Sequence, residues 1–338
     1  MKHYLQRLND KGELTEEESA AVLSEILKGT SSVEDIKLLL ISLKEKGETV
    51  DEMVGFVKVL RSHMKPIHLH TDAMDVCGTG GSGNARFNVS SAAAFVLAAM
   101  GVPIAKHGNR GSKMANGSFD FLEALGIPID VDPAISEVLF KKTGLCFLFA
   151  RQYHPAMRFV GPARAQIKTR TIFNLLGPLC NPASVPIQVI GTTNHENAEK
   201  LALTFQRLGG KRAYIVVGSG GVDDVSIHGV SDIWEVGTSY ISKSQFDPKS
   251  LGLKCGNPPV FGNRSEDNID LFYKLLRNQD PQGTLHALVC LNAGVASACF
   301  GQAPSIEEGF IQAQKALKSG KVLDVFNTYK ESANQLLR

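Results

Sequence analysis

A glycine-rich loop near residue 80 contains the residue types that bind phosphate groups. An apolar run over residues 73–77 ends at a loop with four glycines in six residues. Ser90 and Ser91 then open a helix expected over residues 92–100, which Gly101 ends. Glycines let the backbone approach an anion, and a helix N-terminus offers free N–H groups and partial positive charge. The order of strand, glycine loop and helix start therefore predicts a phosphate site.

A second loop, over residues 106–118, repeats this order. It follows a strand expected over residues 102–105 and precedes a helix expected over residues 119–125, which is entered through Ser118. Three bases among glycines and asparagines favour an anionic ligand over solvated surface charges. These bases are Lys106, Arg110 and Lys113, and Arg86 lies on the first loop. Two anion-binding loops in tandem predict two phosphate groups.

The letters from Gly78 to Gly83 also satisfy the G-x-G-x-x-G fingerprint of dinucleotide-binding proteins. That fingerprint requires the helix to open inside the motif and an acidic residue about twenty positions later. Here residues 84–89 separate the last glycine from the helix, and the next strand leads into Lys106-His107. An isolated match would indicate a plain glycine-rich turn, but the second loop argues against it. A ligand with more negative charge than a ribose hydroxyl is the better interpretation.

The composition is that of an ordinary soluble globular protein. The 338 residues are 43% apolar and 21% charged, and 36 basic against 34 acidic residues leave a formal charge of +2. The sequence contains no long basic run of the kind that would indicate a nucleic-acid partner. The six cysteines form no C-x-x-C pair, which indicates a reducing compartment, and the N-terminus lacks the apolar segment of a secretion signal. The longest apolar run, 92–100, is too short to span a bilayer, so we expect a cytoplasmic protein without a membrane partner.

Residues 1–65 are predicted to form a small all-helical domain. Capping boxes are expected at Thr15 with Glu18, at Ser31 with Glu34 and at Thr49 with Glu52, and amphipathic segments span 20–27, 36–43 and 53–60. Because short helices need partners, we expect them to pack with a later helical segment near residues 160–180 and to present an apolar face to a second subunit. From the pattern alone, packing within one chain is nearly as good an interpretation.

Residues 70–338 are predicted to form a large α/β domain with a mainly parallel central sheet and surrounding helices. A linker over residues 66–71 leads into strands that alternate with helices. The strands are expected over 73–77, 102–105, 146–150, 187–190, 213–217 and 233–236, and further helices over 135–142, 196–208 and 267–277. Such alternation implies helical layers packed on the sheet.

A basic segment over residues 151–179 has the residue types that bind an aromatic carboxylate. A guanidinium pairs with the carboxylate, and the ring lies on apolar surface, here the corner that begins at Phe173. The bases are Arg158, Arg164, Lys168 and Arg170. Their spacing alone does not choose one arginine over its neighbours.

Two adjacent carboxylates, Asp223 and Asp224, follow the glycines after the strand at 213–217. Neighbouring carboxylates repel each other unless a cation joins them, and hard oxygen ligands favour Mg²⁺. A solvated turn would be the better interpretation if no other feature indicated a polyphosphate.

Motifs along nearly the whole chain resemble those of the anthranilate phosphoribosyltransferase family. The matching residues are Gly78-Thr-Gly-Gly, Phe87-Asn-Val-Ser, Lys106-His-Gly-Asn-Arg110, Gly117-Ser, Leu122-Glu-Ala-Leu-Gly126, His154-Pro-Ala-Met, Arg170-Thr-Ile-Phe-Asn-Leu-Leu-Gly-Pro-Leu179 and Asn181-Pro. The resemblance implies a pentosyltransferase of tryptophan biosynthesis that uses Mg²⁺ and is usually a dimer through its helical region. The implied reaction moves phosphoribose from phosphoribosyl diphosphate to the amino group of anthranilate and releases diphosphate.

The resemblance also implies roles for the matched residues. Lys106 and Arg164 are expected to act in catalysis, by stabilising charge on the diphosphate and by orienting anthranilate. The residues expected at phosphoribosyl diphosphate are Gly78, Gly81, Ser82, Arg86, Asn88, Val89, Ser90, Ser91, Lys106, His107, Gly108, Asn109, Arg110, Lys113, Met114 and Ser118. Those expected at anthranilate are Gly78, His107, Asn109, His154, Arg164 and Pro178. Mg²⁺ is expected at Ser90, Asp223 and Asp224. An aromatic amine is neutral at pH 7, so little activation by a general base is expected.

Several positions depart from the family's pattern. Ser82 stands where an Asp is usual, Arg86 where a Thr or Ser is usual, Lys113-Met114 replace a Ser-Ser pair, and Asp224 shortens the second acid of an Asp-Glu pair. These changes either retune diphosphate binding or indicate another aromatic acceptor. Two other classes stay open as alternatives: a pyrimidine nucleoside phosphorylase, which would lack the motif over 173–179, and a non-catalytic nucleic-acid-binding relative, which the near-neutral charge disfavours.

Overall fold

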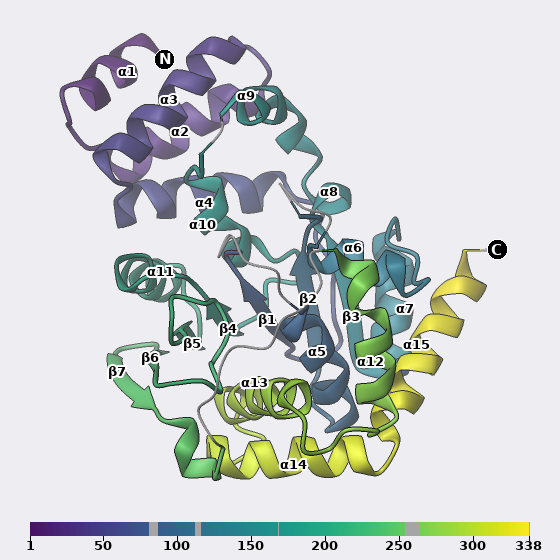
Figure 1. Ribbon diagram of the computed structural model, residues 1–338. Helices are drawn as coiled ribbons and strands as arrows, with labels where there is room; N and C mark the ends of the chain where they lie inside the picture. Colours follow the sequence, from purple (N-terminus) through teal and green to yellow (C-terminus); the bar gives the residue numbers. More distant parts are fainter. Residues whose placement is uncertain (81–86, 112–115, 168, 254–263, 338) are drawn as a thin grey trace.

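A seven-stranded sheet forms the centre of the larger part of the chain (Figure 1). The computed structural model describes residues 1–80, 87–111, 116–167, 169–253 and 264–337. The strands are β1 (Met74–Gly78), β2 (Ile104–Gly108), β3 (Leu145–Phe149), β4 (Ile187–Gly191), β5 (Arg212–Val217), β6 (Ser231–Gly237) and β7 (Ile241–Phe246). In the order β3-β2-β1-β4-β5-β6-β7 the first five are parallel, and β6 is antiparallel to both of its neighbours. The predicted mainly parallel sheet is confirmed.

Strand β7 was not predicted from the sequence. Its central residues, Ser-Lys-Ser-Gln at 242–245, are exposed, so the strand lacks the apolar alternation that marks a half-buried strand. It is held by its pairing with β6 and by Lys243, whose ammonium lies 4.5 Å from the centre of the Trp234 ring. Backbone pairing, which leaves no pattern in the sequence, forms this edge.

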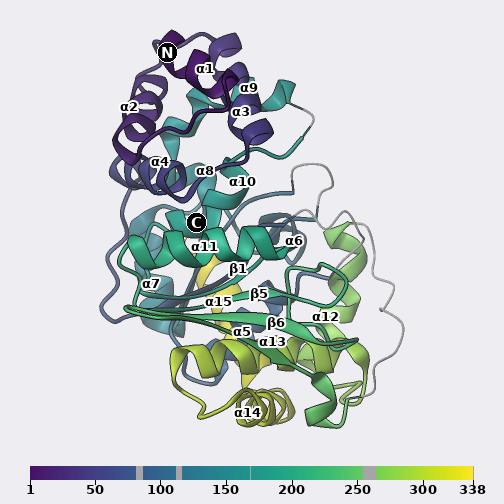
Figure 2. The same ribbon diagram turned by 90° about the vertical axis from the view of Figure 1, so that its left-hand side faces the viewer.

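Helices cover both faces of the sheet (Figure 2). One face packs against α5 (Val89–Ala99), α6 (Ser118–Ala124), α7 (Pro133–Thr143), α12 (Ile269–Leu276), α13 (Thr284–Phe300), α14 (Ile306–Lys318) and α15 (Lys321–Leu336). The opposite face packs against α11 (His195–Arg207) and the N-terminal helices. Neighbouring residues of a strand point to opposite faces, so Tyr214 and Val216 lie in the first core and Ile215 lies in the second. Two short 3-10 helices, η3 (Pro248–Leu251) and η4 (Ser265–Asn268), lie between β7 and α12.

Helix α13 was also missed by the sequence analysis. This helix is buried on nearly all sides. Apolar residues therefore occur all around its surface, and its sequence shows no amphipathic period.

Within the described residues, no helix is long and apolar enough to cross a membrane.

Four helices form the N-terminal part of the chain: α1 (Lys2–Asn9), α2 (Glu16–Leu27), α3 (Val33–Lys46) and α4 (Val50–His63). The predicted capping boxes at Thr15 and Thr49 are confirmed, since both reciprocal hydrogen bonds form at each. The box predicted at Ser31 is wrong. Helix α3 begins one residue later than that box requires, and the hydroxyl of Ser32 accepts the N–H of Asp35 at 3.1 Å.

The described part of residues 150–180 contains five short helices: α8 (Ala150–Tyr153), η1 (Pro155–Phe159), α9 (Gly161–Gln166), α10 (Phe173–Leu176) and η2 (Gly177–Cys180). Helix α9 packs on α3, and α10 packs on α4, where the rings of Phe173 and Phe56 lie 6.0 Å apart. This segment therefore connects the sheet to the N-terminal helices (Figure 1).

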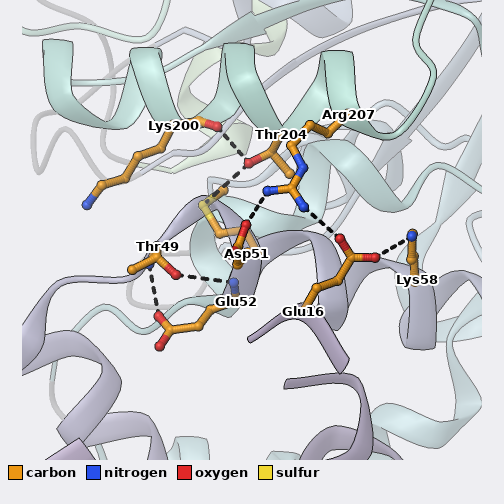
Figure 3. A network of polar contacts seen from close by, with 9 residues as sticks. Glu16, Thr49, Asp51, Glu52, Lys58, Lys200, Thr204 and Arg207 are labelled. Carbon is orange, nitrogen blue, oxygen red and sulfur yellow. Dashed lines mark hydrogen bonds and ion pairs between the residues drawn. The ribbon is translucent and has the colours of Figure 1, made fainter. Parts of the chain in front are cut away.

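Polar contacts join α11 to the N-terminal helices (Figure 3). Arg207 of α11 pairs with Asp51 of α4 and, at 2.7 Å, with Glu16 of α2. Next to this cluster, the hydroxyl of Thr204 lies 3.8 Å from the sulfur of Met53. Exposed ion pairs contribute only about 0–1 kcal/mol each, so the buried apolar surface between α4 and α11 does most to hold the two parts together.

Candidate active site

The predicted phosphate loops lie at the carboxyl edge of the sheet, where the strand order reverses. Strand β1 has β2 on one side and β4 on the other, and its last residue, Gly78, is in register with Gly191 of β4. In open α/β sheets, ligands bind outside the carboxyl ends of the strands at such a reversal. Loops after β1, β2 and β5 therefore surround one position.

The first loop leads into α5 earlier than predicted. The helix begins at Val89 instead of residue 92, with Asn88 in the N-cap position, so Ser90 and Ser91 lie within its first turn. Val89 is buried in the core, which leaves only its backbone for a ligand. The side-chain amide of Asn88 donates to the carbonyl of Asn116 at 3.3 Å and joins the two loops. Gly81, Ser82 and Arg86, all predicted at this site, lie outside the described residues.

Three residues predicted as metal ligands line one small cavity of about 20 Å³: Ser90, Asp223 and Asp224. The carboxylate of Asp223 accepts the N–H of Gly80 at 2.9 Å, which fixes the acidic loop against the first glycine loop. A cavity of this size holds about one water molecule or ion. No cluster of three or more His, Cys, Asp or Glu residues that could hold a metal occurs in the described part of the chain. The donor set of two carboxylates and a hydroxyl still fits Mg²⁺, because Mg²⁺ takes most of its ligands from water and substrate phosphates.

Gly191 allows this close approach of the acidic loop. A Cβ atom at Gly191 would lie 1.7 Å from the backbone oxygen of Asp223, whereas nothing lies within 4 Å of a Cβ at Gly161. Backbone atoms move only with their loop, so we expect Gly191→Ala to displace Asp223, to lower the free energy of unfolding by about 1–3 kcal/mol and to weaken Mg²⁺ binding. Urea unfolding and magnesium titration measure the two effects. Gly161→Ala is the control, and equal stability of the two variants would contradict the prediction.

Lys106 and His107 lie in β2, although the sequence analysis ended this strand at residue 105. Lys106 is almost fully buried, and its ammonium donates to the carbonyl of Val76 at 2.7 Å. The fully buried carboxylate of Asp75, which the sequence analysis missed as a site residue, accepts from the backbone N–H of His107 at 3.2 Å and from the Asn181 amide at 2.8 Å. Burial raises the pKa of Asp75 to about 6, although the charge of Lys106 opposes this shift. Lys106 therefore adds positive charge from within the sheet and not from a loop.

The second loop uses much of its own polar capacity internally. Arg110 pairs with Glu123 at 2.8 Å, and the carboxylate of Asp120 accepts the backbone N–H groups of Gly111 and Gly117 at 2.7 and 2.8 Å. Ser118 does not cap α6, because Gly117 holds the N-cap position. These contacts leave fewer free donors for a phosphate than the sequence predicted. Lys113 and Met114 lie outside the described residues.

Two other predicted residues of this loop, Gly108 and Asn109, also contact Ser118. A Cβ atom at Gly108 would lie 2.3 Å from the Ser118 hydroxyl, which itself donates to the carbonyl of Asn109 at 3.4 Å. A side chain at position 108 would therefore require the Ser118 hydroxyl to move.

Arg164 is a partly buried guanidinium on α9. Within the described residues, no carboxylate pairs with it, and its guanidinium carbon lies 5.4 Å from the centre of the Phe173 ring. Burial lowers the pKa of Arg164, but a guanidinium stays charged at any working pH. A half-buried cation beside an aromatic ring is a suitable receptor for an aromatic carboxylate.

Side chains from α4, β2, β4 and the residue between α8 and η1 bind the four successive carbonyls of η2. The donors to Gly177, Pro178, Leu179 and Cys180 are His107 at 3.2 Å, Gln188 at 2.8 Å, Arg61 at 2.9 Å and His154 at 2.9 Å. We name these four donors the carbonyl clamp. It places the predicted acceptor-site residues His107, His154 and Pro178 together, and the two imidazole rings lie 5.2 Å apart.

Arg170 connects this segment to the first glycine loop. Its guanidinium donates to the carbonyls of Thr79 and Gly80 at 2.6 and 2.5 Å. The sequence analysis grouped Arg170 with the other bases of the segment and assigned it no role. Only the tertiary structure places it against a loop 90 residues away.

Burial makes both clamp histidines poor bases. It lowers the pKa of His107 to about 3 and that of His154 to about 4. Both values are depressed, so the stability they contribute is present above the unfolded pKa of about 6.5 and is lost as the pH falls towards 4. Asp75 has the opposite effect on stability, because its raised pKa stabilises the folded state as the pH falls below about 6.

Between about pH 6 and pH 4, the unfolded chain thus binds a net one proton more than the folded chain at these three groups. We expect their contribution to unfolding free energy to fall by about 1.4 kcal/mol per pH unit on acidification. The His154→Gln variant retains a donor for the carbonyl of Cys180 and lacks one titrating group. On acidification, the unfolding free energy of this variant should therefore fall less steeply than that of the parent, by about 1.4 kcal/mol per pH unit. Parallel unfolding curves for the parent and the variant across this range would contradict the assignment.

The two parts of the chain match the two domains of one glycosyl transferase family. Residues 2–64 match its helical bundle domain, and residues 70–323 match its a/b domain, so fold and site together define a glycosyltransferase. A curated anthranilate phosphoribosyltransferase of Geobacillus kaustophilus (strain HTA426) is 39% identical over 94% of both chains. One of Streptococcus pneumoniae (serotype 19F, strain G54) is 37% identical over 98% of this chain and 99% of its own. The chain belongs to the anthranilate phosphoribosyltransferase family.

Solved structures agree with this placement. The anthranilate phosphoribosyltransferase of Thermus thermophilus has a TM-score of 0.90 at 34% identity, with 98% of this chain and 99% of that chain covered. The enzyme of Saccharomyces cerevisiae, solved in complex with PRPP and Mg, has a TM-score of 0.89 at 24% identity, with 98% and 97% covered. At that identity, the yeast structure supports the fold alone.

Proposed function

We propose that this chain transfers phosphoribose from phosphoribosyl diphosphate to the amino group of anthranilate and releases diphosphate. The observation that supports this most directly is the cavity lined by Ser90, Asp223 and Asp224, whose residues lie more than 130 positions apart in the sequence. Asp223 of this cavity accepts the N–H of Gly80 in the first glycine loop, and Arg170 connects that loop to the segment that carries Arg164. This connection supports a diphosphate site at the cavity and a carboxylate site at Arg164 within one active site.

Different residues of the chain have different roles in this reaction. We infer that Ser90, Asp223 and Asp224 hold Mg²⁺, which when bound supplies positive charge to the departing diphosphate. Lys106 adds a buried positive charge at the ends of β1 and β2, where the same leaving group develops charge. Arg164 orients the acceptor through its carboxylate, so that the amine faces the sugar.

Ligand-induced stabilisation and product formation test the proposal. Phosphoribosyl diphosphate with Mg²⁺ should raise the melting temperature, and anthranilate should raise it further, because ligands that bind only the native state stabilise it. The full mixture should consume anthranilate and release diphosphate. Stabilisation and turnover with thymidine and phosphate, or a salt-dependent affinity for DNA, would instead favour one of the two other classes.

We also propose that the helical domain, residues 1–65 with the segment near 160–180, is the contact surface of a homodimer. Val33 and Leu38 on α3 are 37% and 44% exposed, so α3 offers apolar side chains that a second subunit could cover. Sedimentation of the parent and of Leu38→Glu tests this. The variant should sediment as a monomer, and a parent that is already monomeric would refute the proposal.

A further inference from the structure

The carbonyl clamp fixes which nitrogen of His107 bears the hydrogen. Nδ1 lies 3.2 Å from the carbonyl oxygen of Gly177, and a carbonyl oxygen only accepts hydrogen bonds. Nδ1 must therefore donate. A neutral imidazole bears one N–H, so Nε2 of His107 has a free lone pair. Burial keeps the ring neutral, since it lowers the pKa of His107 to about 3.

Nε2 of His107 is buried and has no hydrogen-bond partner among the described residues. The whole residue is only 6% exposed. An unsatisfied buried acceptor destabilises the folded state, and such atoms in native structures call for an explanation, often a functional one. The neighbouring His154 differs, because its Nε2 donates to the carbonyl of Cys180 at 2.9 Å.

The contacts of His107 relate it to the proposed acceptor site. His107 contacts η2, which continues directly from α10, and α10 begins with Phe173, the ring beside Arg164. Arg164 and His107 therefore border the same short segment, with a carboxylate receptor at one end and a hydrogen-bond acceptor at the other.

We propose that Nε2 of His107 accepts a hydrogen bond from the amino group of the aromatic acceptor and takes its proton as the C–N bond forms. This rests on the proposed function. The C1–O bond to diphosphate breaks with its electron pair on the leaving oxygen, and the nitrogen lone pair forms the new bond to C1. The N–H proton moves to Nε2, while the Nδ1–H group keeps its hydrogen bond to the carbonyl of Gly177. The imidazolium then returns its proton to water as the site opens for product release.

A weakly basic acceptor is adequate for this step. Bond formation makes the aromatic nitrogen cationic and strongly acidic, so its proton leaves readily once an aligned acceptor is present. A neutral imidazole also avoids repelling the cationic sugar that develops at C1. The low basicity that burial imposes on His107 thus suits a proton acceptor that acts late in the reaction.

Two substitutions separate this role from structural support. In His107→Asn the shorter amide can still donate to Gly177 but leaves no atom at the Nε2 position. In His107→Gln an amide reaches the Nε2 position, where its oxygen can accept but not keep a proton. We expect kcat to fall about a hundredfold in His107→Asn and less in His107→Gln. The melting temperature should stay near the parent's value, and the stabilisation by phosphoribosyl diphosphate with Mg²⁺ should fall far less than kcat does.

Gln188→Ala is the control for the clamp itself. It removes the donor to Pro178 without touching His107, so it should lower the melting temperature and reduce kcat far less than His107→Asn does. Single-turnover rates in H₂O and D₂O give a second measurement. A solvent isotope effect in the parent that disappears in His107→Asn would support proton transfer to this nitrogen.

Three results would overturn the inference. The first is a kcat of His107→Asn within about threefold of the parent. The second is an equal loss of kcat in Gln188→Ala, which would mean that only the position of η2 matters. The third is a loss of phosphoribosyl diphosphate binding in His107→Asn that is as large as the loss of kcat. A parent that binds both substrates but forms no product would instead refute the proposed function, which is measured on the parent alone.

Discussion

Asp223→Asn is expected to lower kcat about a thousandfold at ordinary magnesium concentrations while leaving the fold intact. A metal ion that polarises a leaving group is worth several kcal/mol of transition-state stabilisation, and about 4 kcal/mol corresponds to this loss. An Asn side chain can still accept the N–H of Gly80 through its amide oxygen, so the loop should keep its position. The variant removes only the negative charge that attracts Mg²⁺.

A magnesium titration distinguishes this explanation from a folding defect. Activity of Asp223→Asn should recover in part as magnesium is raised, because the site is weakened and not destroyed. Asp232→Asn is the matched control: Asp232 is a carboxylate on β6 that pairs with His195 at 2.7 Å and does not line the cavity of Asp223. An unaltered magnesium dependence in Asp223→Asn would remove Asp223 from the metal site.

Arg164→Ala is expected to lower kcat/KM for anthranilate several hundredfold, with almost all of the loss in KM. Truncating one partner of a buried charge pair costs about 2–5 kcal/mol, because the other charge is left unpaired in a desolvated site. Arg164 is partly buried, and no carboxylate of the described residues competes for it. The affinity for phosphoribosyl diphosphate should stay nearly unchanged.

Two variants test the specificity of this effect. Arg158→Ala is the control, since Arg158 belongs to the preceding short helix and its guanidinium lies over the Phe159 ring at 4.7 Å. Its loss should leave KM nearly unchanged. Arg164→Lys keeps the charge but not the planar fork and should restore only part of the affinity. Equal losses of both substrate affinities in Arg164→Ala would indicate a folding defect or a different arginine.

Local patterns identified the elements that depend on local interactions. The capping boxes at Thr15 and Thr49 form because their hydrogen bonds join residues three positions apart. The buried parallel strands were found because both of their faces are apolar. The strand ends were predicted less accurately. Strand β2 continues through Lys106 and His107, which the sequence analysis missed because polar residues within a strand give the same sequence pattern as a loop.

The candidate ligands could be named from the sequence, but not their partners. Ser90 and Asp223 were predicted because of their residue types and the motifs around them, and the tertiary structure places both at one cavity. Arg110, predicted as a phosphate-binding base, pairs in this structure with acidic side chains of α6. Spacing cannot predict that outcome, because charge pairing depends on how a side chain is oriented within its loop.

The sequence by itself determined the class of fold, the two glycine loops and the residue types at the site, because each of these follows from local patterns of polarity and from motif letters. Only the tertiary structure decided that Arg170 holds the first loop, that Lys106 is buried within the sheet and that His107 keeps its hydrogen on Nδ1. Each of those facts is a contact between residues 30 to 91 positions apart. Such contacts form only when the strands align and η2 packs across their ends, and no local pattern in the chain records them.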